Sequence, residues 1–418
     1  MAVKSKEKIF IFSLVLMFSV AFFSRAQNKK EKKEEPVTAL LGGTVIDGTG
    51  SAPDVNATVL LQGAKILAVG PASAIKVPKG AKVIDVRGKF ILPGFIDCHT
   101  HITSETDQLE YYTDTDSLAA LRGLQLMNLY LKSGVTAIRD VGSPIESIQA
   151  LRKAQEMGYV DTIRLFPCGY LITVTGGHAH DMHGALEADG PWAFRKAVRE
   201  MYQEGFRHIK ISPTFTSEEA RAAVDEAKTL GMHITAHGGG FSDTIPTTMT
   251  RIAVQAGVEC IEHWNEMEDD VLDLMAQKGV YDVPTLTIYR ESYKVDDINR
   301  FLIEKRHWSQ AMHETLFRKA RDRKIVMGIG TDAGGQYRKQ YPKIYFDEMK
   351  YFVELGASPM EAIVAATKNG ALILGMADEL GTIEAGKLAD LQVLGEDPLK
   401  SFNALGKPEI VFVNGKAH

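Results

Sequence analysis

Apolar strand-like runs alternate with amphipathic segments through the middle of the chain. The amphipathic segments at residues 118–131, 218–230 and 271–277 have helical spacing, and several such segments open with Ser, Thr or Asp and close with glycine. About eight apolar strands alternate with them, at residues 97–102, 137–141, 164–168, 209–212, 234–237, 260–263, 281–285 and 326–331. This order predicts an α/β fold in which a parallel sheet closes into a (β/α)8 TIM barrel. An open doubly wound sheet is the alternative, which is disfavoured because no glycine-rich dinucleotide motif follows the first strand.

Short β-branched runs separated by glycine turns mark both ends of the chain. They lie at residues 44–48, 59–63, 66–70 and 83–86, and again at residues 389–394 and 410–415. Because the two ends share this sequence pattern and differ from the middle, we expect them to build one small composite β-sandwich domain. Its two parts are residues 37–90 and 377–418, and the barrel, residues 91–376, is a single insertion between them.

The first residues have the pattern of an export signal. Three lysines precede an apolar run at residues 9–23, and small residues stand at positions 24 and 26. The run is shorter than the roughly 20 residues of a membrane-spanning helix. We therefore expect a cleaved signal peptide over residues 1–26 and a periplasmic or secreted protein with no stable membrane anchor; an uncleaved anchor is the alternative. The mixed charges of residues 27–36 predict a disordered linker.

The composition is that of an ordinary soluble globular protein. Of the 418 residues, 45% are hydrophobic and 24% are charged, and the formal net charge of -5 provides no basic surface for nucleic acid. The three cysteines, Cys98, Cys168 and Cys260, are an odd number in apolar, strand-like surroundings. We expect them to be buried free thiols rather than disulfide partners.

Titratable residues stand at the ends of the predicted barrel strands. His99 and His101 end the motif GFIDCHTH, and because alternate strand residues point to the same side, they can offer two imidazoles to one zinc ion. Catalytic residues of a barrel gather at the carboxyl ends of its strands. We therefore expect one mouth of the barrel to hold His99, His101, Lys210, His237, His263 and Asp332.

Each of these residues also has a purely structural interpretation. The alternatives are an ordinary solvated strand at His99 and His101, a salt-bridged core lysine at Lys210, a helix cap at His237, a pair with Glu262 at His263, and a turn residue at Asp332. A shared site accounts for all of them at once, since every one stands at a predicted strand end.

The motifs ILPGFIDCHTH, GVTAIRDVG, TGGH, HIKIS, ITAHG, CIEHW, GIGTDAG and GTIEAGKLADLQVL follow one another along the chain. Together they resemble the amidohydrolase superfamily, and within it the imidazolonepropionase-like group that includes prolidase-type dipeptidases. The resemblance implies two zinc ions, one held by His99, His101 and Asp332 and the other by His237 and His263. It also implies that Lys210 is carboxylated by carbon dioxide and bridges both ions, because burial leaves an amine neutral enough to form a carbamate. Imidazole and carboxylate ligands accept manganese, iron or cobalt as well.

The same resemblance implies hydrolysis of an amide-like C–N bond in a dipeptide, an N-acyl amino acid or a cyclic amide. Two metal ions would lower the pKa of a bridging water to provide hydroxide, and Asp332 would take its proton and pass it to the leaving nitrogen. A lactone or phosphoester hydrolase on the same metal centre is the alternative. A non-catalytic binding protein is a third class, which the complete set of ligands argues against.

Three residues are candidates for contact with substrate. His178 matches a histidine that resembles a binder of the substrate carboxylate in prolidase-like relatives. Tyr289 is a candidate to hydrogen-bond the tetrahedral oxyanion, with a core tyrosine as the alternative. Gly239 lies in a run of three glycines where many relatives carry a polar or aromatic side chain, so the pocket is expected to admit a bulkier substrate or a close backbone amide. This departure, and a short connection from Lys210 to His237, put a dipeptidase activity in question.

The loop of His178 also contains His180 and His183, and their spacing matches no strong metal motif. Contact with substrate and simple solvation both stay open for these two histidines. The expected partner is a small-molecule or short-peptide substrate, and association into homo-oligomers stays open.

Overall fold

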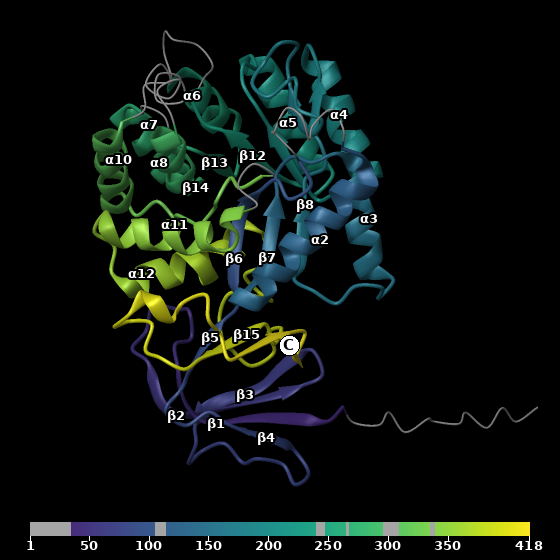
Figure 1. Cartoon of the computed structure of the whole chain (residues 1–418). Coiled ribbons are helices and arrows are strands. Elements are labelled where there is room, and N and C mark those ends of the chain that lie inside the picture. The colour runs from purple at the N-terminus through teal and green to yellow at the C-terminus, as the bar shows by residue number, and fades with distance from the viewer. Residues whose placement is uncertain (1–34, 105–113, 240–246, 265–266, 296–308, 335–338) are drawn as a thin grey trace, which may run out of the picture. The chain divides into compact units, whose positions relative to one another are not determined.

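Strands from both ends of the chain pair in one sheet (Figure 1). The computed structural model describes residues 35–104, 114–239, 247–264, 267–295, 309–334 and 339–418. The eight strands of this sheet are β1 (Val37–Val45), β2 (Asp54–Gln62), β3 (Lys65–Pro71), β4 (Lys82–Asp85), β5 (Phe90–Pro93), β15 (Leu391–Leu394), β16 (Ile410–Val413) and β17 (Lys416–Ala417). Their order is β17-β16-β15-β5-β1-β2-β3, with β4 beside β1. Because β5 pairs with both β1 and β15, the expectation that the two chain ends build one β unit is confirmed.

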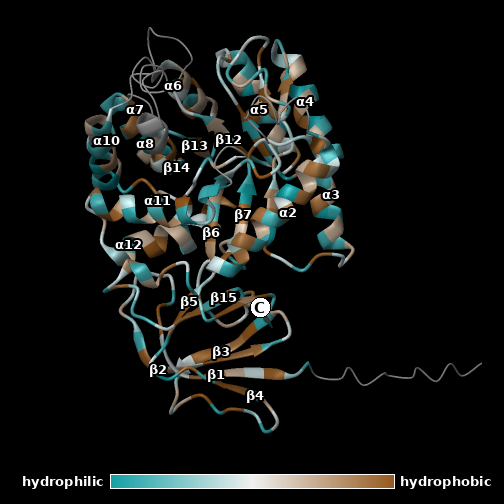
Figure 2. Cartoon of the chain, viewed as in Figure 1, coloured by the Kyte–Doolittle hydropathy of each residue, from teal (hydrophilic) through white to brown (hydrophobic). Residues whose placement is uncertain are grey.

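Apolar residues from both ends of the chain form one buried cluster among these strands. Figure 2 shows the strands β1, β2 and β3 largely in the hydrophobic colour. The cluster consists of Leu40, Val45, Ala57, Val59, Leu61, Ile66, Val86, Ile91, Ile383, Ala389, Leu391, Val393 and Phe412. β1 ends earlier than the expected strand at residues 44–48 because Asp47 turns the chain. The carboxylate of Asp47 accepts hydrogen bonds from the backbone N–H (2.8 Å) and the hydroxyl (2.7 Å) of Thr49.

The middle of the chain forms two parallel sheets with helices packed along them (Figure 1). One sheet has the order β6 (Phe95–Thr100), β7 (Val135–Asp140) and β8 (Arg164–Pro167). The other has the order β10 (Ala185–Glu187), β9 (Leu171–Thr173), β11 (His208–Ile211), β12 (His233–His237), β13 (Cys260–Glu262) and β14 (Tyr281–Val283). Seven of the eight expected strands are therefore present, as β6, β7, β8, β11, β12, β13 and β14.

The expected eighth strand, at residues 326–331, does not form as a regular strand. Within this described segment only Met327 makes an isolated bridge, with Asp282 of β14, and the bridge to Thr100 of β6 comes from Ala333, just beyond the segment. Backbone hydrogen bonds nevertheless hold it between these two strands, from Asp282 N–H to the Val326 carbonyl (3.0 Å) and from Cys98 N–H to the Ile329 carbonyl (2.8 Å).

Two glycines explain why this segment departs from regular pairing. A Cβ on Gly328 would lie 2.5 Å from Ile373 Cδ1, and a Cβ on Gly330 would lie 2.3 Å from Val283 Cγ1. The side chains of Ile373 and Val283 thus occupy the space that a side chain at either glycine would need. A glycine in a strand pattern often marks such a close approach, and it weakens the strand.

The helices are α2 (Asp116–Ser133), α3 (Ile145–Glu156), α4 (Pro191–Gln203), α5 (Ser217–Thr229), α6 (Thr247–Ala256), α7 (Asp269–Lys278), α8 (Leu286–Val295), α10 (Gln310–Asp322), α11 (Lys343–Glu354), α12 (Pro359–Val364) and α13 (Gly370–Ile373), with a π-helix at Ala365–Asn369 and a 3-10 helix at Phe402–Ala404. The three named helix predictions are confirmed by α2, α5 and α7.

Local sequence signals set the ends of these helices. A capping box between Thr216 and Glu219 opens α5, and Gly134 closes α2 with a φ of 91°.

The cysteines Cys98, Cys168 and Cys260 are buried and free, as expected. Within the described ranges, every helix is too short or too polar to cross a membrane. The expected signal peptide, residues 1–26, and residues 27–34 of the expected linker lie outside the described residues.

Replacing Gly134 with alanine should destabilise the fold more than replacing Gly158 with alanine. Both glycines have a positive φ, 91° and 73°, so alanine costs about 1 kcal/mol at either position. A Cβ on Gly134 would also lie 2.2 Å from Gln392 Oε1, whereas a Cβ on Gly158 has nothing within 4 Å. The crowding should add about 1–3 kcal/mol at Gly134. Urea unfolding followed by circular dichroism compares the two variants, and equal losses would show that Gln392 moves aside without cost.

Candidate metal centre

Three side chains that can bind a metal meet at the carboxyl end of β6. His99 Nε2 and His101 Nε2 each lie 3.3 Å from Asp332 Oδ1. One potential ligand atom from each of the three residues lies within 4.8 Å of the others, which suits a single metal ion. The side chain of His99 is fully buried and that of Asp332 is 25% exposed. Asp332 is therefore the most accessible member of this group.

Further histidines continue this group as a row of imidazole rings. The ring centroids lie 4.5 Å apart for His99 and His263, 4.3 Å apart for His263 and His237, and 4.1 Å apart for His237 and His178. Burial lowers the pKa of His237 and of His263 well below the ordinary value, so both rings are neutral and can offer a lone pair to a metal. The structure thus brings all five predicted histidines together beside Asp332.

Lys210 lies on β11 and is buried, with 2% of the residue exposed. Burial is the main reason why its pKa falls below the ordinary value of 10.5, and the carboxylates of Glu262 and Asp332 act in the opposite direction. Among the described residues, none forms an ion pair with its amine. A buried lysine in this condition has an amine that is readily neutral.

Glu262 and Arg139 hold the ring of His99 in place. Glu262 Oε2 lies 2.7 Å from His99 Nδ1, and Arg139 Nη2 donates to Glu262 Oε1 at 2.5 Å. Arg139 Nε also donates to the carbonyl of Cys98 at 2.7 Å, and the hydroxyl of Thr235 donates to Glu262. The carboxylate fixes the Nδ1 proton of His99 and so leaves Nε2 as the nitrogen with a free lone pair.

The surroundings of His99 Nε2 fit a metal ion. This nitrogen is buried and has no hydrogen-bond partner within the described parts of the chain. Buried polar atoms are rarely left unsatisfied, and a cation shared with Asp332 Oδ1 would satisfy this one. The two neutral imidazoles and the carboxylate are also the donor types that divalent zinc binds.

The alternative pairing of Glu262 with His263 is wrong. Glu262 bonds to His99 and Arg139, whereas His263 Nδ1 lies 2.7 Å from Thr285 Oγ1. The reason is local: His263 follows the last residue of β13 with a φ of 70°, which turns the two side chains apart. Sequence analysis missed the role of Arg139, and the signal was a charged residue inside an apolar strand.

Asp97 was also missed, and it fixes the end of β6 against the segment that carries Asp332. Its carboxylate accepts hydrogen bonds from the hydroxyls of Tyr130 (2.5 Å) and Thr331 (2.8 Å). It also accepts the backbone N–H groups of His99 and Thr331, both at 3.1 Å. Burial raises the pKa of Asp97 to about 6, although these hydrogen bonds act to lower it. Asp97 therefore positions both segments of the ligand group.

The candidate substrate residues lie around the same group. His178 packs against His237, and the ring of Tyr289 on α8 lies 6.2 Å from that of His263. The backbone N–H of Gly239 donates to Thr250 Oγ1 at 2.8 Å, so this amide is already engaged and the expected approach of that amide to substrate is not supported. His180 Nδ1 instead lies 3.4 Å from Glu187 Oε1, in a pair that is nearly half exposed.

Gly238 has a structural role. A Cβ at this position would lie 2.8 Å from Ile261 Cγ2 and 2.9 Å from the carbonyl of His263. The ends of β12 and β13 therefore approach each other too closely for any side chain at Gly238. Gly240, the last residue of the glycine run, lies outside the described residues.

A buried carboxylate caps the helix that carries Tyr289. Glu348 on α11 accepts the backbone N–H groups of Leu286 (2.8 Å) and Thr287 (2.6 Å) at the start of α8. Burial raises the pKa of Glu348 to about 7, although these hydrogen bonds act to lower it. Glu348 thus anchors the first turn of a helix beside the metal-binding group.

The sequence profile of the amidohydrolase family matches residues 90–418. Ochratoxinase from Aspergillus niger is 26% identical over 433 aligned residues, which cover 90% of this chain and 85% of that protein. Imidazolonepropionase from Symbiobacterium thermophilum is 24% identical, over 79% of this chain and 81% of that protein. The crystal structure of a Xaa-Pro dipeptidase with bound methionine superimposes with a TM-score of 0.81 at 29% identity, covering 91% of this chain and 99% of that one.

Replacing Glu262 with glutamine should weaken the binding of a divalent metal ion by about 10–100-fold, because His99 loses the carboxylate that orients it. Competition with a chelating dye measures the affinity without any need for turnover. Glu259→Gln is the matched control. Glu259 directly precedes β13, which ends in Glu262, and it bonds to His233 (2.7 Å), which is not a candidate metal ligand. Thr235→Val removes one hydrogen bond to Glu262 and no charge, so it should cause a smaller loss of metal affinity. This variant replaces Glu262→Gln as the test if Glu262→Gln does not fold. Unchanged affinity in both variants would show that Glu262 does not orient His99.

The stability of the wild type should fall relative to Glu348→Gln as the pH rises from 4.5 to 7. Glu348 has a pKa of about 7 in the folded protein and 4.5 as its ordinary value. In this window the folded state therefore holds a proton that the unfolded state has lost, and raising the pH removes the associated stability. The full effect corresponds to about 3 kcal/mol. Urea unfolding at both pH values checks this, and equal pH dependence in the two proteins would mean that Glu348 is ionised throughout.

Proposed function

Because the chain belongs to the amidohydrolase family, we propose that it hydrolyses an amide-like C–N bond in a small molecule or short peptide. The observation that carries this proposal is the group of His99, His101 and Asp332, in which His99 Nε2 is oriented by Glu262 and lacks a partner within the described structure. The names of the similar proteins include an imidazolonepropionase and a Xaa-Pro dipeptidase. They support a dipeptide, an N-acyl amino acid or a cyclic amide as the substrate.

We propose two divalent cations, with Zn2+ as the metal that this ligand set suits. His99, His101 and Asp332 would hold one cation, and His237 and His263 would hold the other. The buried amine of Lys210 supports a bridging carbamate, because burial lowers its pKa and a neutral amine is the form that reacts with carbon dioxide. Bound cations would supply an acidified water and polarise the substrate carbonyl.

Asp332 is the proposed proton shuttle. Burial alone would raise its pKa, but the neighbouring imidazoles of His263, His101 and His99 hold that pKa well below the ordinary value. The carboxylate therefore starts ionised and can accept a proton from the attacking water. With 25% of its side chain exposed, Asp332 can also face the leaving nitrogen and return the proton to it.

Three residues around the group would select and orient the substrate. His178 is proposed to bind a substrate carboxylate, since its ring stands at the end of the imidazole row. Tyr289 is proposed to donate a hydrogen bond to the developing oxyanion, and its helix is anchored by Glu348. Gly239 would leave space for a bulky group, because it carries no side chain.

The finer architecture and the location of the protein are parts of the same proposal. The hydrogen bonds of residues 326–331 with β14 and β6 support closure of the two parallel sheets into a (β/α)8 barrel over residues 91–376. Residues 37–90 and 377–418 would form the β-sandwich beside it. The N-terminal pattern supports a signal peptide at residues 1–26 and export to the periplasm or the medium.

Metal content and hydrolysis together test the proposed function. The purified wild type should contain about two metal ions per chain and hydrolyse members of a panel of dipeptides, N-acyl amino acids and cyclic amides, with each cleavage forming a new amino group. Lys210→Ala should lose at least one ion and lower turnover by more than about 100-fold. His208→Gln is the matched control, because His208 is buried on the same strand and bonds to the carbonyl of Leu374 (3.2 Å).

The remaining outcomes separate the alternatives. One ion in the wild type would rule out the Lys210 bridge and leave a single-metal mechanism. Turnover of lactones or phosphoesters without any amide would favour the other class of hydrolase. Absence of metal after reconstitution with zinc and bicarbonate would overturn the catalytic proposal.

A further inference from the structure

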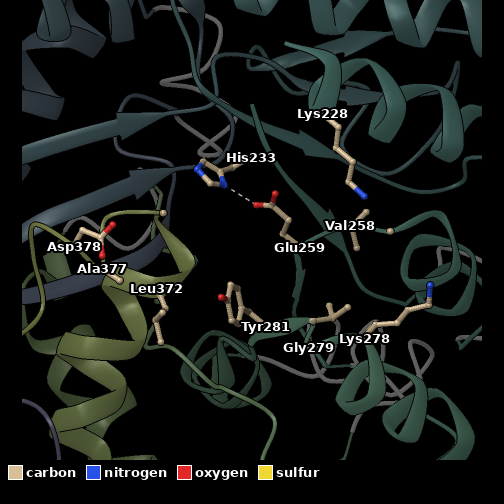
Figure 3. Close-up of a pocket in the computed structure, with 13 residues that line it drawn as sticks. Lys228, His233, Val258, Glu259, Lys278, Gly279, Tyr281, Leu372, Ala377 and Asp378 are labelled. Atoms are coloured by element: carbon tan, nitrogen blue, oxygen red, sulfur yellow. Dashed lines mark hydrogen bonds and ion pairs between the residues drawn. The ribbon is translucent and has the colours of Figure 1, made fainter. Parts of the chain in front are cut away.

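A cavity of about 620 Å3 lies at the amino ends of the parallel strands (Figure 3). We call it the basal cavity, and its polar lining residues include Lys228, His233, Glu259, Lys278, Tyr281 and Asp378. His233 begins β12 and Tyr281 begins β14, while Glu259 directly precedes β13. Because β12 rises by about 3.3 Å per residue, His233 lies on the order of 13 Å from His237 at the other end of the strand. The basal cavity is therefore separate from the candidate metal centre.

Opposite charges lie on opposite sides of the basal cavity. In Figure 3 the amine ends of Lys228 and Lys278 lie on one side and Asp378 lies on the other, with His233 and Glu259 between them. Glu259 bonds to His233 Nδ1 at 2.7 Å, so its charge is compensated within the wall. In the described chain, the two amines and the carboxylate of Asp378 form no ion pairs. Both signs of charge are thus available to a ligand.

The wall between these charges is preformed. The ring of His233 stacks on that of His208, with centroids 5.1 Å apart and an interplanar angle of 26°. On its other edge, a Cβ on Gly375 would lie only 2.2 Å from His233 Nε2, so the chain packs directly against this ring. Val258 and Leu372 add apolar surface to the lining. A preformed wall lowers the entropy cost of binding a ligand.

We propose that the basal cavity binds a small zwitterion, either a free amino acid or a short peptide. Its carboxylate would face Lys228 and Lys278, its ammonium group would face Asp378, and an apolar side chain would rest on Val258 and Leu372. The volume falls within the range of about 300–1,000 Å3 that is typical of small-molecule sites. The proposal is independent of the proposed hydrolysis, since the basal cavity shares no residue with the candidate metal centre.

Isothermal titration calorimetry with three matched probes tests the zwitterion preference. The probes are leucine, 4-methylpentanoate, which lacks the amine, and 3-methylbutylamine, which lacks the carboxylate. Leucine should bind at least several-fold more tightly than either of the other two. Replacing Asp378 with asparagine should remove the advantage of leucine over 4-methylpentanoate, because the ammonium group loses its counter-charge. Equal binding of leucine and 4-methylpentanoate to the wild type would overturn the assignment of a zwitterion.

Paired lysine variants locate the binding site. Lys228→Gln combined with Lys278→Gln should weaken leucine binding by more than 10-fold. The matched control is Lys79→Gln combined with Lys350→Gln, which removes the same charge from exposed positions outside the cavity and should bind leucine as the wild type does. Undiminished binding in the first double variant would place leucine at the metal centre instead and overturn the proposal. Failure of the wild type to bind leucine at millimolar concentration would overturn it as well.

Discussion

A buried ion pair between Arg139 and Glu262 joins three strands that are far apart in the sequence. Arg139 lies on β7, Glu262 ends β13, and the carboxylate of Glu262 reaches His99 on β6. Both charged side chains are almost fully buried, at 2% and 0% exposure, and removing such groups from water costs several kcal/mol for each ion. That cost is offset only when the remaining donors and acceptors are satisfied. Here the bonds that satisfy the pair also orient His99 of the candidate metal centre, so the stability of the core and the geometry of the site depend on the same atoms.

Close backbone packing is the second constraint on the site. Gly328 and Gly330 let the segment before Asp332 pass between β6 and β14, and Gly238 lets the ends of β12 and β13 meet. Two of the candidate ligand residues, His263 and Asp332, lie outside the regular strands, and both have a positive φ. Such backbone conformations persist when surrounding contacts enforce them. Asp97 supplies part of that enforcement, since it bonds to the backbone on both sides of the group.

The sequence was sufficient to predict that the candidate ligand residues lie together, because the alternation of strands and helices places the carboxyl ends of the parallel strands at one end of the sheet. It was also sufficient to predict the joining of the two chain ends, since both carry the same short β-branched runs. It was not sufficient to assign Glu262 to His99, because that partner comes from another strand and depends on the turn at His263. The irregular segment at residues 326–331 was predicted as a strand for a similar reason. Its apolar pattern is that of a strand. Its glycines, however, are required by side chains that come close to them only in the folded chain.

The pairing of β5 with β15 has a consequence for how the protein is made. The side chain of Gln392 donates to the carbonyl of Pro93 at 3.1 Å, across 299 positions of the chain. During synthesis from the amino end, β5 therefore has no partner from β15 until about 300 further residues have been made. Contacts of such long sequence separation form late and slowly, because the loop between them must close first. The strands β15 to β17 thus complete a sheet whose other strands were translated much earlier, and the edge of β5 stays open to other chains until then.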